Sequence, residues 1–476
     1  MKKKLFFSLL LCFCSIGFSQ IPNFPTPQTS APSAAVNIPH FVNMSGSSIK
    51  NAAHIPSPGN VLLKKQNQTL IQETQKSINA MSKEQQKPLS SDNEEKEFLQ
   101  NFRLPSLANK EGAPAYHSAF KSLSKLNPED YSIADATFFV ENAFYDNDKK
   151  FQSMYQDYIR KASDIIRNKI RQQNIDDDDN ASKNLTLFQY FSTDTRQNGK
   201  VLHKAVKYDF DDYWGTKDYS KMFVSKLMRT NTGQCHSMPL LYLILAEQIG
   251  ARASLVMSPN HSYIRFNDND GEPLNIELTN GMFTANSFVL NNGYIKSEAL
   301  QNKLYMQSLS KRQLLSQTFV DLASGYIHKF GYDEFVGEIL NKAQELNPHN
   351  INAVLWESNL NQQRFEKSCD HLGINPHNKE ELQKISNYKD LVLQLDNING
   401  QFDFIDRSGF AQMPAEQYEK WLGSIQKAEN KQLNDEILEK IKAVEAQKRK
   451  QQEIQKKQRI TPKKEAPKVY LIPVLT

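Results

Sequence analysis

Cysteine is scarce in this chain, with four residues in 476. Two of the four, Cys12 and Cys14, lie in an apolar N-terminal leader, which leaves Cys235 and Cys369 for the rest of the chain. No CxxC motif and no HxxxH spacing accompanies them, which argues against a zinc site. Because these two cysteines lie in different segments, we expect both thiols to be free, and we predict no metal and no cofactor.

Long apolar runs are also lacking after the first residues. No later segment approaches the roughly 20 apolar residues that a helix needs to span a bilayer, so we predict no transmembrane segment. At the N-terminus, Lys2–Lys4 precede a short apolar run, Leu5–Phe18, and small residues come just before Gln20. This order is typical of a secretory signal peptide over residues 1–19. It predicts an exported protein, either periplasmic or secreted.

An evenly spread basic charge is lacking too, although the formal net charge is +5. Residues 440–468 hold eleven Lys and Arg against three Glu, and three further lysines belong to the signal peptide. The rest of the chain is therefore slightly acidic, which argues against the basic surface of a nucleic-acid-binding domain. We predict no nucleic-acid partner.

Composition and periodicity divide the chain into five parts. Residues 20–60 are rich in Pro, Ser and Asn without periodicity, which predicts a disordered leader. The acidic run Asp176–Asp179 is interpreted as a solvated loop, since a calcium site would need alternating ligands and a glycine. The predicted parts are a signal peptide (1–19), a polar leader (20–94), a thiol domain with N-terminal helices (95–300), a helical region (301–430) and a charged helix with a basic tail (431–476).

Helical spacing marks the segments before and after the middle of the chain. Apolar residues recur at intervals of three and four within 116–170, which predicts three helices. Beyond about residue 300 the pattern is all-helical. The residues that resemble a tetratricopeptide repeat are Ala323, Ser324, Ile327, Gly331-Tyr332-Asp333-Glu334, Val336, Leu340, Ala343 and Pro348. Residues 351–365 and 415–428 are candidate continuations, and such helices either bind a protein partner or pack against the preceding domain.

The segment Thr232–Ile244 is the most informative part of the sequence. A flexible Thr-Gly-Gln precedes Cys235 and an apolar run follows, so Cys235 lies at the entrance of a predicted helix. Backbone N–H groups and the helix dipole favour a thiolate at such a position. Pro239 leaves two starts open. With Cys235 as N-cap the proline would remove an early helical bond, whereas Ser237 as N-cap places Cys235 just outside the helix.

A β-hairpin is predicted a short distance further along the chain. Residues 267–271 form a dense turn signal between two extended runs, 261–266 and 272–278. If these five residues form the loop, Phe266 pairs with Glu272, and this pairing sets the register of the whole hairpin.

The predicted register brings two functional groups together. His261 would face Glu277, with Cβ atoms about 5 Å apart and side chains on one face. Asn275 would lie diagonally on that face, which makes it a second candidate for orienting the imidazole.

These residues resemble the transglutaminase-like (papain-like thiol) superfamily. That family has Gly-x-Cys at a helix start, a buried helix ending in Leu-Gly or Ile-Gly, a strand with His and a strand with Asp. The corresponding residues here are Gly233-Gln234-Cys235, Ile249-Gly250, Asn260-His261 and Ile276-Glu277-Leu278. The resemblance covers roughly residues 200–285 and implies an α+β fold with a helix packed on an antiparallel sheet. It also implies thiol-based hydrolysis or acyl transfer at an amide.

Two departures from the family pattern concern the site itself. Glu277 stands where the family usually has Asp, so the carboxylate is one methylene longer. Ser262 stands where an aromatic residue commonly follows the histidine.

The chemistry needs a thiol, a base that takes its proton, and a carboxylate that fixes the base. The predicted roles are nucleophile for Cys235, base and acid for His261, orienting carboxylate for Glu277, and candidate orienting or oxyanion groups for Asn275 and Gln234. The backbone N–H of Cys235 is a further candidate oxyanion donor. We expect His236 to be a surface or supporting residue, because adjacent residues at a helix start point apart.

Three functional interpretations follow from these features. The first is a thiol enzyme that hydrolyses or transfers protein or peptide amides through a thioester. The second is an inactive scaffold of the cell envelope whose repeat-like helices recruit a protein, with Cys235 a packing residue as most free cysteines are. The third is an envelope-associated structural protein tethered by its basic tail to acidic polymer or lipid. Labelling of Cys235 by an electrophile would separate the first interpretation from the others.

The composition of the C-terminal tail leads to a first prediction. Residues 431–476 carry little apolar surface, so removing them should leave the melting temperature of the protein nearly unchanged. Thermal unfolding of the full-length and shortened chains, followed by circular dichroism, measures this. A large drop in melting temperature would show that the tail is docked on the folded part.

Overall fold

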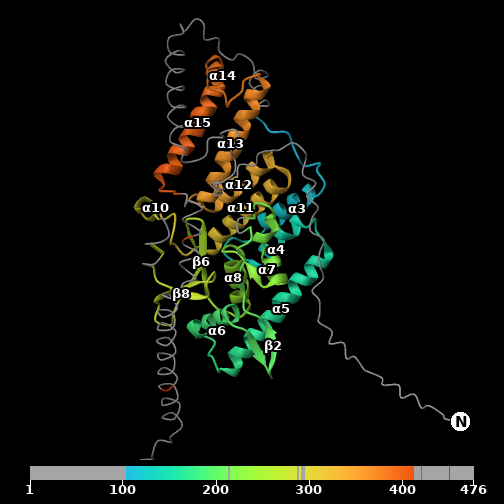
Figure 1. Ribbon diagram of the computed structural model, residues 1–476, viewed down its shortest axis with the longest axis vertical. Coiled ribbons are helices and arrows are strands. Elements are labelled where there is room, and N and C mark those ends of the chain that lie inside the picture. The colour runs from blue at the N-terminus through green and yellow to red at the C-terminus, as the bar shows by residue number, and fades with distance from the viewer. Residues whose placement is uncertain are drawn as a thin grey trace, which may run out of the picture.

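The computed structural model describes residues 103–212, 215–286, 289–290, 295–411, 420 and 450. Over these residues the chain has a mixed α+β fold, as predicted, with helices packed around small sheets (Figure 1). The predicted signal peptide, polar leader, repeat continuation at 415–428 and basic tail lie outside the described residues, apart from positions 420 and 450. No helix within the described ranges has both the length and the apolar character needed to cross a membrane.

Within the described part of the chain, four helices precede the first strand. They are α3 (Ala113–Ser124), α4 (Ile133–Phe144), α5 (Lys149–Gln172) and α6 (Asn180–Ser192). The first three coincide with the predicted apolar spacing. The acidic run Asp176–Asp179 is a loop, as expected, whereas helix α6, which begins directly after it, is not predicted from the sequence. In the structure Asp179 is the N-cap of α6, and its carboxylate accepts a hydrogen bond from the backbone N–H of Ser182 at 3.0 Å.

The middle of the chain holds the strands and short helices that build the site. They are β1 (Thr195–Gln197), β2 (Lys200–His203), β3 (Lys207–Tyr208), η1 (Tyr219–Met222), α7 (Val224–Thr230), β4 (Thr232–Gly233), α8 (Ser237–Gln248), β5 (Ser254–Ser258), β6 (His261–Asn267), β7 (Pro273–Glu277) and β8 (Met282–Thr284). Strands β1 and β2 pair antiparallel, β3 and β4 pair parallel, and β5 to β8 form one antiparallel sheet in chain order.

Helix α8 lies at the centre of this part of the fold (Figure 1). It contacts α4, α5, α6 and α7 as well as β5 and β6. Every residue from Ser237 to Ala246 is buried. A helix that is apolar on all sides can be stable only when it is enclosed, and the run of apolar residues after Met238 satisfies this condition.

The hairpin of β6 and β7 differs from the predicted register by two residues. Phe266 pairs with Leu274 and not with Glu272. The loop explains the difference, because the backbone N–H of Asp268 donates to the carbonyl of Glu272 at 2.9 Å. The Asp268 carboxylate in turn accepts the backbone N–H groups of Asp270 and Glu272, both at 2.9 Å. This side-chain closure of the turn draws Glu272 into the loop.

The corrected register keeps the functional side chains on one face. A shift of two residues preserves the alternation of side chains, so His261 and Glu277 still project from the same side of the sheet. Continuing the observed pairing places Glu277 opposite Tyr263. Glu277 is therefore a diagonal neighbour of His261 instead of its direct partner.

From residue 297 to residue 407 the chain is helical. The elements of this part are α10 (Ser297–Gln301), α11 (Lys311–Phe330), α12 (Glu334–Leu346), α13 (Ile351–His371), α14 (Lys379–Leu382), η2 (Gln383–Asn387) and α15 (Lys389–Arg407). Helices α11 and α12 form a helical hairpin, and α13 packs on α15. Helix α11 also packs on α3 and α4, so one hydrophobic core runs from the N-terminal helices across residue 300 to α13. A second cluster fills the space between α13 and α15.

Aromatic side chains join α3 to α11. The rings of Tyr116 and Tyr326 meet edge to face with centroids 5.4 Å apart, and Phe330 lies 5.7 Å from Tyr116. Gly325 permits this approach, since an added Cβ would lie 3.2 Å from the Tyr116 oxygen. Both tyrosines are fully buried. The Tyr326 hydroxyl donates to Asp333 Oδ2 at 2.8 Å, whereas that of Tyr116 has no hydrogen-bond partner among the described residues.

This contrast predicts opposite effects of the same substitution. Tyr116→Phe removes a buried hydroxyl without a partner, so the free energy of unfolding should rise by about 1 kcal/mol. Tyr326→Phe takes a donor from the buried carboxylate of Asp333, so the free energy of unfolding should fall by about 1–3 kcal/mol. Urea unfolding of both variants measures the changes. A loss of stability in both would mean that the Tyr116 hydroxyl does have a partner.

Candidate active site

Cys235 lies between β4 and α8, just before the helix begins at Ser237. Its neighbour His236 is the N-cap and makes no side-chain capping bond. The Ser237 hydroxyl accepts the backbone N–H of Gln234 at 2.9 Å. Pro239 falls in the first turn, where its missing N–H removes no helical bond. Of the two predicted helix starts, the structure has the one with Cys235 outside the helix, although the N-cap is His236 instead of Ser237.

The strand before the cysteine is tightly packed. Gly233 pairs with Tyr208 of β3, and its carbonyl accepts the backbone N–H of Asp209 at 2.9 Å. A Cβ added at Gly233 would lie 2.8 Å from Met238 Cγ and 3.0 Å from the Ser237 hydroxyl. Glycine is therefore required at the end of β4, where the chain enters the thiol loop, Gln234–His236.

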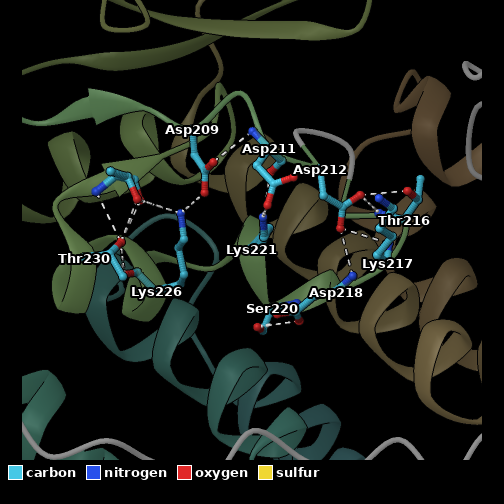
Figure 2. Close-up of polar contacts among 11 residues, drawn as sticks. Asp209, Asp211, Asp212, Thr216, Lys217, Asp218, Ser220, Lys221, Lys226 and Thr230 are labelled. Carbon is cyan, nitrogen blue, oxygen red and sulfur yellow. Dashed lines mark hydrogen bonds and ion pairs between the residues drawn. The ribbon is translucent and has the colours of Figure 1, made fainter.

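Charged side chains also hold β4 and the loop that precedes α7 in place (Figure 2). Lys226 forms an ion pair with Asp209 and donates to the carbonyl and hydroxyl of Thr232 at 3.0 and 2.9 Å. The Asp212 carboxylate accepts hydrogen bonds from backbone and side-chain donors of residues 216–218. These carboxylates are committed to the loop itself, which fixes the chain ahead of Cys235.

His261 and Glu277 are in direct contact inside the protein. His261 Nε2 lies 2.5 Å from Glu277 Oε2, and the two side chains are only 3% and 6% exposed. The other carboxylate oxygen accepts the backbone N–H and the hydroxyl of Thr279 at 3.0 and 2.6 Å. A diagonal pair is separated by more than a direct pair, so the longer side chain of Glu suits this position better than that of Asp.

The imidazole also interacts with the thiol. Burial alone would lower the pKa of His261, but the charge of Glu277 and hydrogen bonds with Cys235 and Glu277 outweigh it and raise the pKa to about 10. Because Nε2 faces Glu277, Nδ1 is the ring nitrogen available to the thiol. The structure thus brings together the three residues predicted as nucleophile, base and orienting carboxylate.

Two contacts hold the thiol loop against β6 and the turn that precedes it. The Cys235 sulfur lies 3.9 Å from the carbonyl oxygen of Asn260, and the Ser262 hydroxyl donates to the carbonyl of Cys235 at 2.6 Å. Asn260 has a positive φ of 59° in the two-residue turn between β5 and β6. Ser262 is a site residue to which the sequence assigned no role. The available signal was that a small hydroxyl replaces the aromatic residue of the family pattern next to His261.

The other two candidate residues do not contact the imidazole. Asn275 accepts a hydrogen bond from Arg265 Nε at 2.8 Å and donates to Asn286 Oδ1 at 2.8 Å. Gln234 is fully buried, and its side-chain amide lies against the carbonyl oxygens of Asp209 and Gly233, which accept from its nitrogen at 3.1 and 3.0 Å when the nitrogen is assigned to that side. Both amides therefore support the backbone and the sheet around the site.

A cleft of about 1100 Å³ opens beside the thiol. Its lining includes Cys235, His261 and Ser262 together with residues of α11 and of the segments 301–305, 307–309 and 347–352. The C-terminal helices therefore contribute directly to the space that a substrate would enter. Among the described lining residues, the Asp, Glu, Lys and Arg side chains are limited to Lys303, Asp321 and Arg407.

No family model, no curated protein and no solved structure matches this chain. The family resemblance therefore rests on the motif residues alone. Within the described ranges, no group of three or more His, Cys, Asp or Glu side chains is arranged to hold a metal ion. Cys235 and Cys369 are both buried and neither is in a disulfide bond, and burial raises the pKa of Cys369 to about 12.

The raised pKa of His261 predicts a loss of stability in alkaline solution. A histidine titrates near about 6.5 in an unfolded chain, whereas His261 titrates at about 10 in the folded protein. The folded state therefore holds an extra proton between these values, and the free energy of unfolding should fall as the pH rises from about 6.5 to about 10. Glu277→Gln removes the main cause of the raised pKa and should flatten this dependence.

Urea unfolding of the wild type and of Glu277→Gln across this pH range measures the effect. Other titrating groups are common to both proteins, so the difference between the two curves isolates the pair. Parallel curves would contradict the assignment of the raised pKa to Glu277.

Proposed function

We propose that this chain is an exported thiol enzyme with a transglutaminase-like core that acts on protein or peptide amide bonds through a thioester on Cys235. The observation that carries the proposal is the buried contact of 2.5 Å between His261 and Glu277, together with the nearby Cys235, whose interaction with the same imidazole helps to raise its pKa. Desolvating two charged groups is costly, so a cysteine with only a packing role gains nothing from such neighbours. Strongly shifted pKa values of this kind cluster at functional sites.

The geometry supports a two-step acyl transfer. At neutral pH the imidazole of His261 already holds the proton, because its pKa is about 10, and the Cys235 thiolate attacks the amide carbonyl carbon to form a C–S bond and an oxyanion. The imidazolium then gives its proton to the amide nitrogen as the C–N bond breaks, which releases an amine and leaves a thioester. Water or an acceptor amine then attacks the thioester carbonyl carbon and loses a proton to His261. The C–S bond breaks, which releases an acid or a new amide and restores the Cys235 thiolate beside the imidazolium. Glu277 stabilises the imidazolium throughout.

The size and lining of the cleft support a polypeptide substrate. Its volume of about 1100 Å³ lies just above the usual range for small-molecule pockets, which is about 300–1,000 Å³. Neutral amides and hydroxyls, such as Gln307, Ser308 and Asn347, outnumber charged groups in the described lining. Such groups match the N–H and C=O groups of an extended chain. The helices after residue 300 would then hold the substrate while the thiol reacts with it.

Reaction with iodoacetamide tests the nucleophile. We expect Cys235 to be alkylated selectively in the folded protein at neutral pH, with a rate that rises through a midpoint below the value of about 8.5 for an ordinary cysteine. Cys369 is an internal control, because its pKa is raised to about 12 by burial and it should stay unmodified. Mass spectrometry of the labelled peptides measures both sites.

Two variants on the same strand separate the roles of the carboxylate and the nearby amide. Glu277→Gln should raise the alkylation midpoint of Cys235, whereas Asn275→Ala should leave it unchanged because Asn275 contacts Arg265. With a substrate in hand, Glu277→Gln should lower turnover by about 10² to 10⁴, by analogy with the carboxylate of other triads. A wild-type midpoint at or above that of ordinary cysteine would favour the scaffold interpretation.

A further inference from the structure

His236 follows the proposed nucleophile directly, yet its side chain reaches a distant part of the sequence. Its Nε2 atom lies 3.4 Å from Oδ2 of Asp321 on α11, and the two side chains are 25% and 17% exposed. The other oxygen of Asp321 accepts a hydrogen bond from Gln317 Nε2 at 3.0 Å. All three side chains line the cleft. The carboxylate is thus held in place on the side of α11 that faces the thiol loop.

The surroundings of His236 favour its charged form. Burial lowers the pKa of His236, but the charge of Asp321, the hydrogen bond to it and the charges of Cys235 and Glu141 outweigh burial and raise the pKa above its ordinary value. Asp321 faces the ring from α11, Cys235 from the thiol loop and Glu141 from α4. The positive charge of the ring lies next to the nucleophile along the chain.

We propose that His236 and Asp321 form a second imidazole–carboxylate pair, which places a positive charge beside Cys235 and so favours its thiolate. The thiol would then lie between two such pairs, with the His261 pair accepting the proton and the His236 pair stabilising the charge that remains on sulfur. His236 acts through the thiol and is a positioning residue. This inference rests on the proposed function, because it takes Cys235 as the nucleophile.

Asp321 comes from the C-terminal helical part of the chain. Asp321 belongs to α11, beyond residue 300, whereas the other charged group of the site, Glu277, comes from the sheet. The C-terminal helices would therefore complete the electrostatics of the thiol site in addition to forming a wall of the cleft.

Three variants test the pair through the pH dependence of Cys235 alkylation by iodoacetamide, which is uncharged. His236→Gln removes the cation and leaves the anion, so it should raise the midpoint most, by about one pH unit, with roughly tenfold slower alkylation at neutral pH. Asp321→Asn removes the anion and, with it, the reason for His236 to be charged, so its midpoint should rise less. The double variant should match Asp321→Asn, because neither protein then carries a charge at these positions.

His328→Gln is the matched control. His328 lines the same cleft but lies about 10 Å further along α11 from Asp321, so its removal should leave the midpoint unchanged. Glu141 is present in every protein compared, so its own titration does not affect the order of the midpoints. Thermal unfolding establishes that each variant is folded before its midpoint is compared, and Asp321→Asn is close to isosteric.

The outcomes for this pair and for the proposed enzyme are distinct. A low wild-type midpoint with all three variants matching the wild type would overturn the role of His236 and Asp321 while leaving the nucleophile in place. An ordinary wild-type midpoint with the predicted order of variants would support the pair and contradict the proposed enzyme. A uniform shift in all three variants would show a structural effect and would also overturn the proposed electrostatic role.

Discussion

The enclosure of α8 is the constraint on which the rest of the site depends. Because every residue from Ser237 to Ala246 is buried, the first turn of the helix cannot rely on water for its backbone groups. The chain just before the helix supplies part of what is needed, since the carbonyl of Gln234 accepts the N–H of Met238 at 3.0 Å. This folds the Gln-Cys-His segment tightly against the helix end. Strand β6 packs on the same helix, and so His261 is brought beside Cys235 by the packing of the core.

The buried carboxylate of Glu277 orients the imidazole of His261, and stability alone does not explain its position. Removing an ion from water costs several kcal/mol even after relaxation, and a buried ion pair often contributes less than an apolar pair of the same size. Glu277 offsets this cost by accepting hydrogen bonds from His261 and from both donors of Thr279. A fully bonded charged pair in the core fixes the direction of the imidazole. That directional property is what proton transfer to and from a neighbouring thiol requires.

The sequence predicts which face of the hairpin carries His261 and Glu277, but it cannot predict their register. The face follows from the alternation of side chains along a strand, which a shift of two residues does not change. The register depends on how Asp268 closes the turn, and several turns are compatible with the same Asn- and Asp-rich run. Helix α6 cannot be predicted from its apolar pattern either. It buries polar residues such as Asn184, which accepts a hydrogen bond from Tyr242 of α8 at 3.0 Å, so its apolar periodicity is weak.

Helix α11 links the two halves of the chain in a way that composition alone does not suggest. One part of it carries Tyr326, which packs on Tyr116 of the first described helix. Another part carries Asp321, which contacts His236 in the lining of the cleft. Closely packed side chains are hardly compressible. A shift of α11 relative to α3 would therefore also move Asp321 relative to the thiol loop. The aromatic contacts between the N-terminal and C-terminal helices therefore belong to the same rigid frame that sets the electrostatics beside Cys235.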